Sequence, residues 1–87
     1  MRKKRNSLNY DYVIDLHGRT LDEALFFLEK EIFSGKYRSI KIIHGQGEGI
    51  LRNGIRKFLF ESSYIKDAFY GEDLNLPGGS GVTVIYL

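Results

Sequence analysis

Residues 12–44, with the sequence YVIDLHGRTLDEALFFLEKEIFSGKYRSIKIIH, decide the fold of this chain. Residues 12–16 are rich in β-forming side chains, which predicts a short strand, and residues 39–44 predict a second strand that is almost continuously apolar at its end. Between them, apolar side chains recur at helical spacing, so we expect a helix over residues 21–34. A strand, a crossover helix and a strand favour two parallel strands with a right-handed connection.

The start and the end of this helix carry their own signals. Thr20 and Glu23 have the spacing of a capping box, in which the Thr20 hydroxyl accepts a hydrogen bond from the Glu23 amide and the Glu23 carboxylate reaches back. Gly35 provides a stop at the other end. This helix is the firmest local prediction from the sequence.

The rest of the chain predicts one more helix and two more strands. A glycine-rich loop over residues 45–49 leads into a second helix that ends near residue 62 or 63, and residues 64–70 form a short third strand. Residues 71–81 form a loop that holds the only proline, and residues 81–87 form the last strand. We therefore predict an α/β fold: a two-layer β-α-β-α-β-β sandwich, in which both helices cover one face of a four-stranded mixed sheet. The last two strands should be antiparallel.

Length and composition restrict the class of protein. A chain of 87 residues is too short for two cores, and 43% hydrophobic with 28% charged residues suits a folded globular domain. Cysteine is absent, which excludes disulfides and thiolate metal sites and fits a reducing compartment. No apolar run approaches the roughly 20 residues that a membrane span needs. We therefore expect a cytoplasmic location and no membrane partner.

Positive charge is concentrated at the N-terminus. The basic cluster consists of Arg2, Lys3, Lys4 and Arg5. The other nine basic residues stand against 11 acidic ones, so the remainder of the chain has a net charge of about −2. We expect residues 1–11 to form a flexible basic segment and residues 12–87 to form the domain. Attraction for polyanions must come from this segment and from local patches, although a solvated leader without a role is the alternative.

Two short motifs, DLHG at residues 15–18 and HGQG at residues 44–47, each follow a predicted strand and precede a helix. Parallel strands bring both motifs to one edge of the sheet, where open α/β sheets bind ligands. The only two histidines, His17 and His44, should therefore converge there. A single histidine at a strand end is more often structural, but two at equivalent ends favour a shared site. Asp15 would be a partner for His17 or part of a metal site.

The surroundings of these motifs suit an anion. Two helix N-termini point at this edge with partial positive charge and unpaired amides. Glycines allow backbone N–H groups to approach a phosphate, and the first turn of the second helix holds Arg52, a cation that a phosphate would stabilise there. The predicted phosphate-binding residues are Gly18, Arg19, Gly45, Gly47, Gly49 and Arg52. The glycine spacing matches neither a nucleotide-hydrolysing P-loop nor a dinucleotide-binding motif.

The candidate metal chemistry is limited by the residue types. A closed zinc site would need four ligands, which the motifs do not supply without cysteine. A Mg²⁺ ion held by Asp15, waters and a phosphate remains open, because this ion needs few protein ligands.

In combination, these motifs resemble the Smr (small MutS-related) domain family. The resemblance is carried by residues 15–18, Glu23-Ala24, residues 42–47, residues 49–52 and residues 78–84, and it covers roughly residues 13–87. It implies the two-layer β-α-β-α-β-β fold, similar to the C-terminal domain of bacterial translation initiation factor three. Members of the family occur at the C-terminus of certain MutS paralogues, in larger eukaryotic proteins and as small stand-alone proteins. Several nick DNA, and others cut messenger RNA, including on collided ribosomes.

The resemblance also places the family's two activity motifs on this sequence. They correspond to Asp15, His17 and Gly18 and to His44, Gly45 and Gly47. Some members carry arginine at the position of His17, so the chemistry of that position varies within the family.

Our first functional hypothesis is an endonuclease or nicking nuclease acting on RNA or DNA phosphodiesters, in mRNA and ribosome quality control or in DNA repair and recombination. His17 and His44 would act as general base and acid, Asp15 would orient His17, and Arg52 with the glycine loop would stabilise the developing charge. Two histidines suffice for RNA, whose 2′-hydroxyl is an internal nucleophile, whereas DNA favours a metal and an activated water. The second hypothesis is a non-catalytic nucleic-acid- or ribosome-binding module at the same edge. A nucleotide or phosphometabolite site is a third, which no base-reading motif supports.

Overall fold

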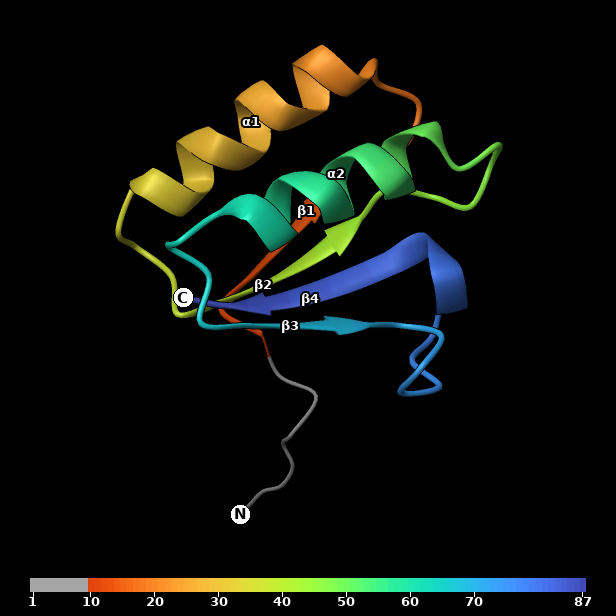
Figure 1. The fold of residues 1–87 in the computed structure, drawn as a ribbon. Coiled ribbons are helices and arrows are strands. Elements are labelled where there is room, and N and C mark those ends of the chain that lie inside the picture. Colours follow the sequence, from red (N-terminus) through yellow and green to blue (C-terminus); the bar gives the residue numbers. More distant parts are fainter. Residues whose placement is uncertain (1–9) are drawn as a thin grey trace.

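In the computed structural model, which describes residues 10–87, two helices cover one face of a four-stranded sheet (Figure 1). The elements are β1 (Tyr12–Asp15), α1 (Leu21–Phe33), β2 (Ser39–Ile43), α2 (Ile50–Glu61), β3 (Asp67–Tyr70), the short 3₁₀ helix η2 (Gly79–Gly81) and β4 (Val82–Tyr86). The predicted order of strands and helices is therefore confirmed. The basic cluster at residues 2–5 lies outside the described residues.

The strands are arranged in the order β1-β2-β4-β3, so β1 and β3 form the edges. β1 and β2 are parallel, as predicted, while β4 runs antiparallel to both β2 and β3. Asp15 pairs with Ile43 at the carboxyl ends of β1 and β2. The two motifs therefore begin side by side.

β3 is shorter than the strand predicted over residues 64–70. Its ladder begins where Asp67 pairs with Tyr86, close to the end of β4. Tyr64 leaves the sheet, because its ring packs nearly perpendicular to that of Phe33, with ring centroids 4.7 Å apart. The aromatic contact thus replaces part of the expected strand.

The two helices begin differently. α1 has the predicted capping box: the Glu23 amide donates to Thr20 Oγ1 (3.2 Å), and the Thr20 amide donates to Glu23 Oε1 (3.1 Å). α2 begins after Gly49, whose φ of +86° suits glycine, and neither a side-chain cap nor an acidic first turn is present there. The first amides of α2 therefore remain available to a ligand.

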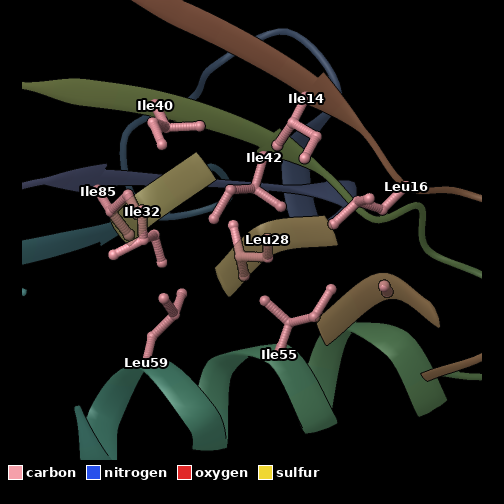
Figure 2. Packing of buried hydrophobic residues seen from close by; sticks show 10 residues of the cluster. Ile14, Leu16, Leu28, Ile32, Ile40, Ile42, Ile55, Leu59 and Ile85 are labelled. Carbon is pink, nitrogen blue, oxygen red and sulfur yellow. The ribbon is translucent and has the colours of Figure 1, made fainter. Parts of the chain in front are cut away.

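The core lies between the sheet and the helices (Figure 2). Leu28 of α1 and Ile55 of α2 are fully buried against Ile42 of β2. The helices also meet closely at their beginnings, because a Cβ atom on Gly54 would lie 2.6 Å from both Cδ atoms of Leu21. Within residues 10–87, no helix is both long and apolar enough to cross a membrane.

Candidate active site at the carboxyl edge of the sheet

A pocket of about 600 Å³ opens beyond the carboxyl ends of β1 and β2. Its walls are residues 17–19 from the first motif and residues 44–52 from the second motif and the start of α2. The pocket brings together both histidines and all six predicted phosphate-binding residues. Asp15 does not line it, but stands directly behind His17.

The two motifs pack against each other through Gly45. Its φ is +83°, and a Cβ atom at this position would lie 3.4 Å from the Cβ atom of His17. The Leu16 amide donates to the carbonyl of Ile43 (2.7 Å), which continues the pairing of β1 and β2 up to the motifs. The backbone itself therefore sets the distance between the motifs.

Asp15 and His17 form an exposed pair at the rim of the pocket. His17 Nδ1 donates a hydrogen bond to Asp15 Oδ1, and the His17 backbone amide donates to the same oxygen (3.2 Å). The side-chain hydrogen bond from His17 is the main cause that lowers the pKa of Asp15, so this carboxyl is ionised at neutral pH. Because a carboxylate only accepts, Nδ1 carries the hydrogen and Nε2 keeps its lone pair. With 68% of its side chain exposed, His17 can present Nε2 to a substrate.

His44 has a different environment. It is only 3% exposed, and both of its ring nitrogens have partners within the protein. Nδ1 lies 3.0 Å from the carbonyl oxygen of Gly45, so it must donate, and in the neutral ring Nε2 then accepts from the hydroxyl of Thr83 at 2.9 Å. Burial is the main cause that lowers the pKa of His44, and nearby arginines add to the effect. We infer that His44 is neutral near pH 7.

The loop after β2 offers fewer free amides than its glycines suggest. The amides of His44 and Gly45 both donate to the carbonyl of Gly81 (3.0 Å each), and the amide of Gly49 donates to that of Gln46 (3.2 Å). In the part of the chain that the structure describes, nothing accepts a hydrogen bond from the amides of residues 46–48. These three groups are the available backbone donors within the loop, in addition to the first amides of α2, and only Gly47 of the three predicted loop glycines is among them. Phosphate binding by the glycines stays a prediction.

Two arginines add positive charge to the pocket, Arg19 from the first motif and Arg52 from α2. The guanidinium carbon of Arg19 lies 4.6 Å from the ring centroid of Phe27. Arg52 donates to the side chain of Asn53 (3.4 Å) and lies against Gly49, where an added Cβ would be 2.7 Å from its Nη2. With the N-termini of α1 and α2, they make the pocket attractive to a phosphate.

The donor set for a metal is small. Residues 10–87 contain no group of three or more His, Asp or Glu side chains that could hold a metal ion. A Mg²⁺ ion held by one carboxylate, waters and a substrate phosphate does not need such a group. The predicted role of Asp15 in binding Mg²⁺ therefore stays a prediction.

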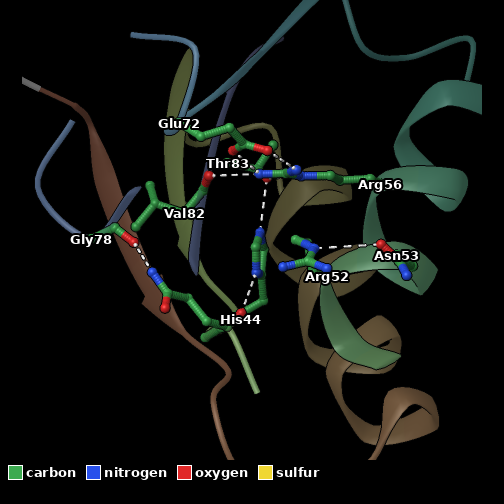
Figure 3. Close-up of polar contacts among 10 residues, drawn as sticks. His44, Arg52, Asn53, Arg56, Glu72, Gly78, Val82 and Thr83 are labelled. Atoms are coloured by element: carbon green, nitrogen blue, oxygen red, sulfur yellow. Dashed lines mark hydrogen bonds and ion pairs between the residues drawn. The ribbon is translucent and has the colours of Figure 1, made fainter. Parts of the chain in front are cut away.

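Sequence reasoning missed the residues that support His44. Arg56 of α2 contacts Thr83 of β4 and Glu72 of the loop after β3, and Thr83 in turn contacts His44 (Figure 3). Arg56 itself could have been noticed in the sequence. This charged residue directly follows Ile55 and stands four residues after Arg52, which places the two arginines on the same side of the helix. No sequence signal indicated its partners, because they lie 16 and 27 residues away.

A mixed sheet with two helices on one face, and paired DLHG and HGQG motifs at one edge, defines a small α/β domain of the Smr type. The Smr domain model matches residues 14–87, and the chain belongs to this family. It is 44% identical over 80 residues to "Endonuclease MutS2" of Caldanaerobacter subterraneus subsp. tengcongensis, an alignment that covers 85% of this chain and 10% of that protein. It is 40% identical over 91 residues to "Endonuclease MutS2" of Finegoldia magna, covering 95% of this chain and 11% of that protein.

The chain thus spans about a tenth of the length of the curated relatives that it matches. Among solved structures, it is similar to the Smr domain of Thermus thermophilus MutS2. The two have a TM-score of 0.75 and 29% sequence identity, and the match covers 87% of this chain and 96% of that one. The predicted family and the predicted fold class are both confirmed.

Proposed function

We propose that this chain is an endonuclease or nicking nuclease domain that binds the backbone of RNA or DNA in the pocket between its two motifs. The observation that carries the proposal is the Asp15–His17 pair, which presents Nε2 of His17 at the rim of a positively polarised pocket. The name endonuclease borne by similar proteins supports the same reaction class.

In this proposal His17 is the general base. With RNA, Nε2 takes the proton of the 2′-hydroxyl, the 2′-oxygen attacks phosphorus, and the bond from phosphorus to the 5′-oxygen breaks. With DNA, the same nitrogen takes a proton from water, the resulting hydroxide attacks the phosphorus, and the bond from phosphorus to the 3′-oxygen breaks. Asp15 keeps the hydrogen of His17 on Nδ1 and stabilises the imidazolium that forms.

The proposed role of His44 differs from the acid expected from sequence. Both of its ring nitrogens already have hydrogen-bond partners, so we assign it to holding the loop. The leaving oxygen then takes its proton from water. Arg19, Arg52 and the amides of residues 46–48 would stabilise the charge that develops on the phosphate.

Matched RNA and DNA strands of one sequence, labelled at one end, test this proposal. The wild type should cut at least one of them, and His17→Ala and Asp15→Asn should lose cleavage while retaining binding. Glu61→Gln, at the exposed end of α2, is the matched control and should cut like the wild type. Cyclic 2′,3′-phosphate ends identify attack by the 2′-hydroxyl. Ends with 3′-hydroxyl and 5′-phosphate groups, together with loss of activity in EDTA, identify a metal-assisted attack by water.

A non-catalytic nucleic-acid- or ribosome-binding module is the second candidate. The burial of His44 favours it, because only one exposed histidine then remains at the pocket, whereas phosphate binding needs neither ring. Binding without cleavage of either strand by the pure wild type, with Mg²⁺ present or absent, would establish this function instead of the nuclease.

The proposed biological role depends on which nucleic acid the protein cleaves. Cleavage of RNA would place the protein in mRNA or ribosome quality control, and nicking of DNA in repair or recombination. A cytoplasmic location belongs to this proposal, because a chain without cysteine suits a reducing compartment.

A further inference from the structure

The guanidinium group of Arg56 joins α2 to β4 and to the loop after β3, and it reaches His44 through Thr83 (Figure 3). Its side chain is only 10% exposed. Nη1 and Nη2 donate to the two carboxylate oxygens of Glu72 (2.7 and 2.8 Å), and Nη2 also donates to the carbonyl of Val82 (3.1 Å). Nε donates to Thr83 Oγ1 (2.9 Å), and the Tyr70 ring centroid lies 3.9 Å from the guanidinium carbon. Every nitrogen of the group is therefore engaged.

These contacts define the direction of a chain of hydrogen bonds. A guanidinium group can only donate, so Thr83 Oγ1 accepts from Arg56 and must direct its own hydrogen elsewhere. His44 Nε2 lies 2.9 Å away and can accept it. The hydrogen of the neutral His44 ring then sits on Nδ1, which donates to the carbonyl of Gly45. Protonation of Nε2 would require the Thr83 hydroxyl to turn its own hydrogen to another acceptor and to accept from Arg56 and His44 together.

We propose that Arg56 is a positioning residue: through Thr83 it keeps His44 neutral with its hydrogen on Nδ1, and through His44 it holds the phosphate-binding loop of residues 45–48. Glu72 is the partner that keeps the guanidinium group in place. The effect on reaction rate rests on the proposed nuclease function, whereas the proton state of His44 does not.

The charged groups around His44 do not all act in the same direction: the two arginines lower its pKa, whereas Glu72 raises it. Arg52 and Arg56 face it from α2, and Glu72 from the loop after β3 is already paired with Arg56. β4 contributes the neutral hydroxyl of Thr83. The two positive charges and the burial of the ring lower the pKa of His44. Removing Arg56 should therefore remove a positive charge and leave Thr83 Oγ1 without its competing donor, and both changes favour a protonated ring.

Nitrogen-15 NMR of the two imidazole rings in the full chain, without nucleic acid, tests this assignment. In the wild type, His44 should show a protonated Nδ1 and an unprotonated Nε2 throughout the neutral pH range. In Arg56→Met the pKa of His44 should rise, so that its ring becomes protonated at a higher pH than in the wild type. Thr83→Ser keeps the hydroxyl and should behave like the wild type, whereas Thr83→Val should remove the hydrogen-bond signature of Nε2.

A wild-type His44 that carries its hydrogen on Nε2, or is cationic at neutral pH, would overturn the proposal. An unchanged His44 titration in Arg56→Met would do the same. If that variant does not fold, Arg56→Lys replaces it, because the compact ammonium group keeps the charge but not the planar fork of the guanidinium group. The hydrogen-bond signature of Nε2 should then change, and an unchanged signature would overturn the proposal.

Cleavage assays supply a separate readout. Arg56→Met should slow cleavage about 10- to 100-fold, which is the scale for misplacing a binding group by about 1 Å, and Thr83→Ser should retain the wild-type rate. A wild type with the expected His44 tautomer but no nuclease activity would refute the proposed function and leave the hydrogen-bond assignment intact.

Discussion

His17 and His44 occupy equivalent places in the sequence, each beyond the end of one of two parallel strands, but their environments differ. β1 is an edge strand, and His17 turns outward with one ring nitrogen paired to a carboxylate. β2 is an inner strand, and His44 is covered by β4 and α2, with both ring nitrogens paired. The difference teaches that similar motifs acquire different chemistry from the position of their strand in the sheet. One histidine is available for proton transfer, and the other is part of the framework.

Replacement of His17 should have the largest effect on activity. His17→Ala removes the exposed ring nitrogen, and cleavage should fall by about two to four powers of ten, the usual scale for a proton-transfer residue. The free energy of unfolding should change by no more than about 0.5 kcal/mol, because the side chain is exposed. Steady-state cleavage rates and urea unfolding of the same samples check both parts. A variant that cuts at the wild-type rate would remove His17 from the mechanism.

Replacement of His44 should instead weaken the fold. His44→Ala leaves a cavity and deprives the Thr83 hydroxyl and the Gly45 carbonyl of their partner, so unfolding should become easier by about 2–4 kcal/mol. Urea unfolding measures the change. Phe60→Ala is a control for the loss of a ring, because Phe60 is 89% exposed and should cost much less. Equal stability of His44→Ala and the wild type would contradict the contrast between the two histidines.

The arginines beside the two motifs should contribute equally to phosphate binding. Arg19→Ala and Arg52→Ala should each reduce the slope of log K against log salt by about 0.7–0.9, the value for one phosphate contact. Lys57→Ala, an exposed position on the same helix as Arg52, should leave the slope unchanged. Titrations of labelled RNA and DNA at several salt concentrations provide the slopes. If only one of the two substitutions reduces the slope, the ligand contacts the pocket on the side of that arginine alone.

The smallest expected effect is on the stability of the fold at acid pH, and it involves the Arg56–Glu72 pair near His44. Pairing with Arg56 lowers the pKa of Glu72 from 4.5 to about 2. Because the folded-state pKa is below the unfolded value, the pair stabilises the fold fully above about pH 4.5 and loses its contribution as the pH falls toward 2. Glu72→Gln should therefore be less stable than the wild type near neutral pH and should lose less stability over this range. Urea midpoints across the range measure this, with Glu61→Gln as the control that should follow the wild type.

The elements of the fold could be predicted because their signals are local. The capping box at Thr20 and the apolar face of α1 appear directly in the sequence, and the structure has both. The convergence of His17 and His44 was also predictable, because a crossover helix between two strands implies parallel neighbours.

The chemistry within the site was less predictable, since it depends on β4. Only the insertion of β4 between β2 and β3 places Thr83 beside His44 and the Gly81 carbonyl beside the amides of His44 and Gly45. Nothing near residue 44 in the sequence indicates these contacts. The roles of the site residues therefore depend on partners from the last strand of the chain.

The close approach of Gly54 to Leu21 makes the width of the pocket a property of the core. Residues 17–19, directly before α1, and the beginning of α2 form parts of its walls, and the contact between Gly54 and the Leu21 side chain sets the spacing of the two helices there. A pocket of fixed width selects ligands by the distance between their phosphates. This distance depends on the sugar and its pucker and hardly on the bases. A rigid pocket would therefore discriminate between RNA and DNA strands while accepting any base sequence.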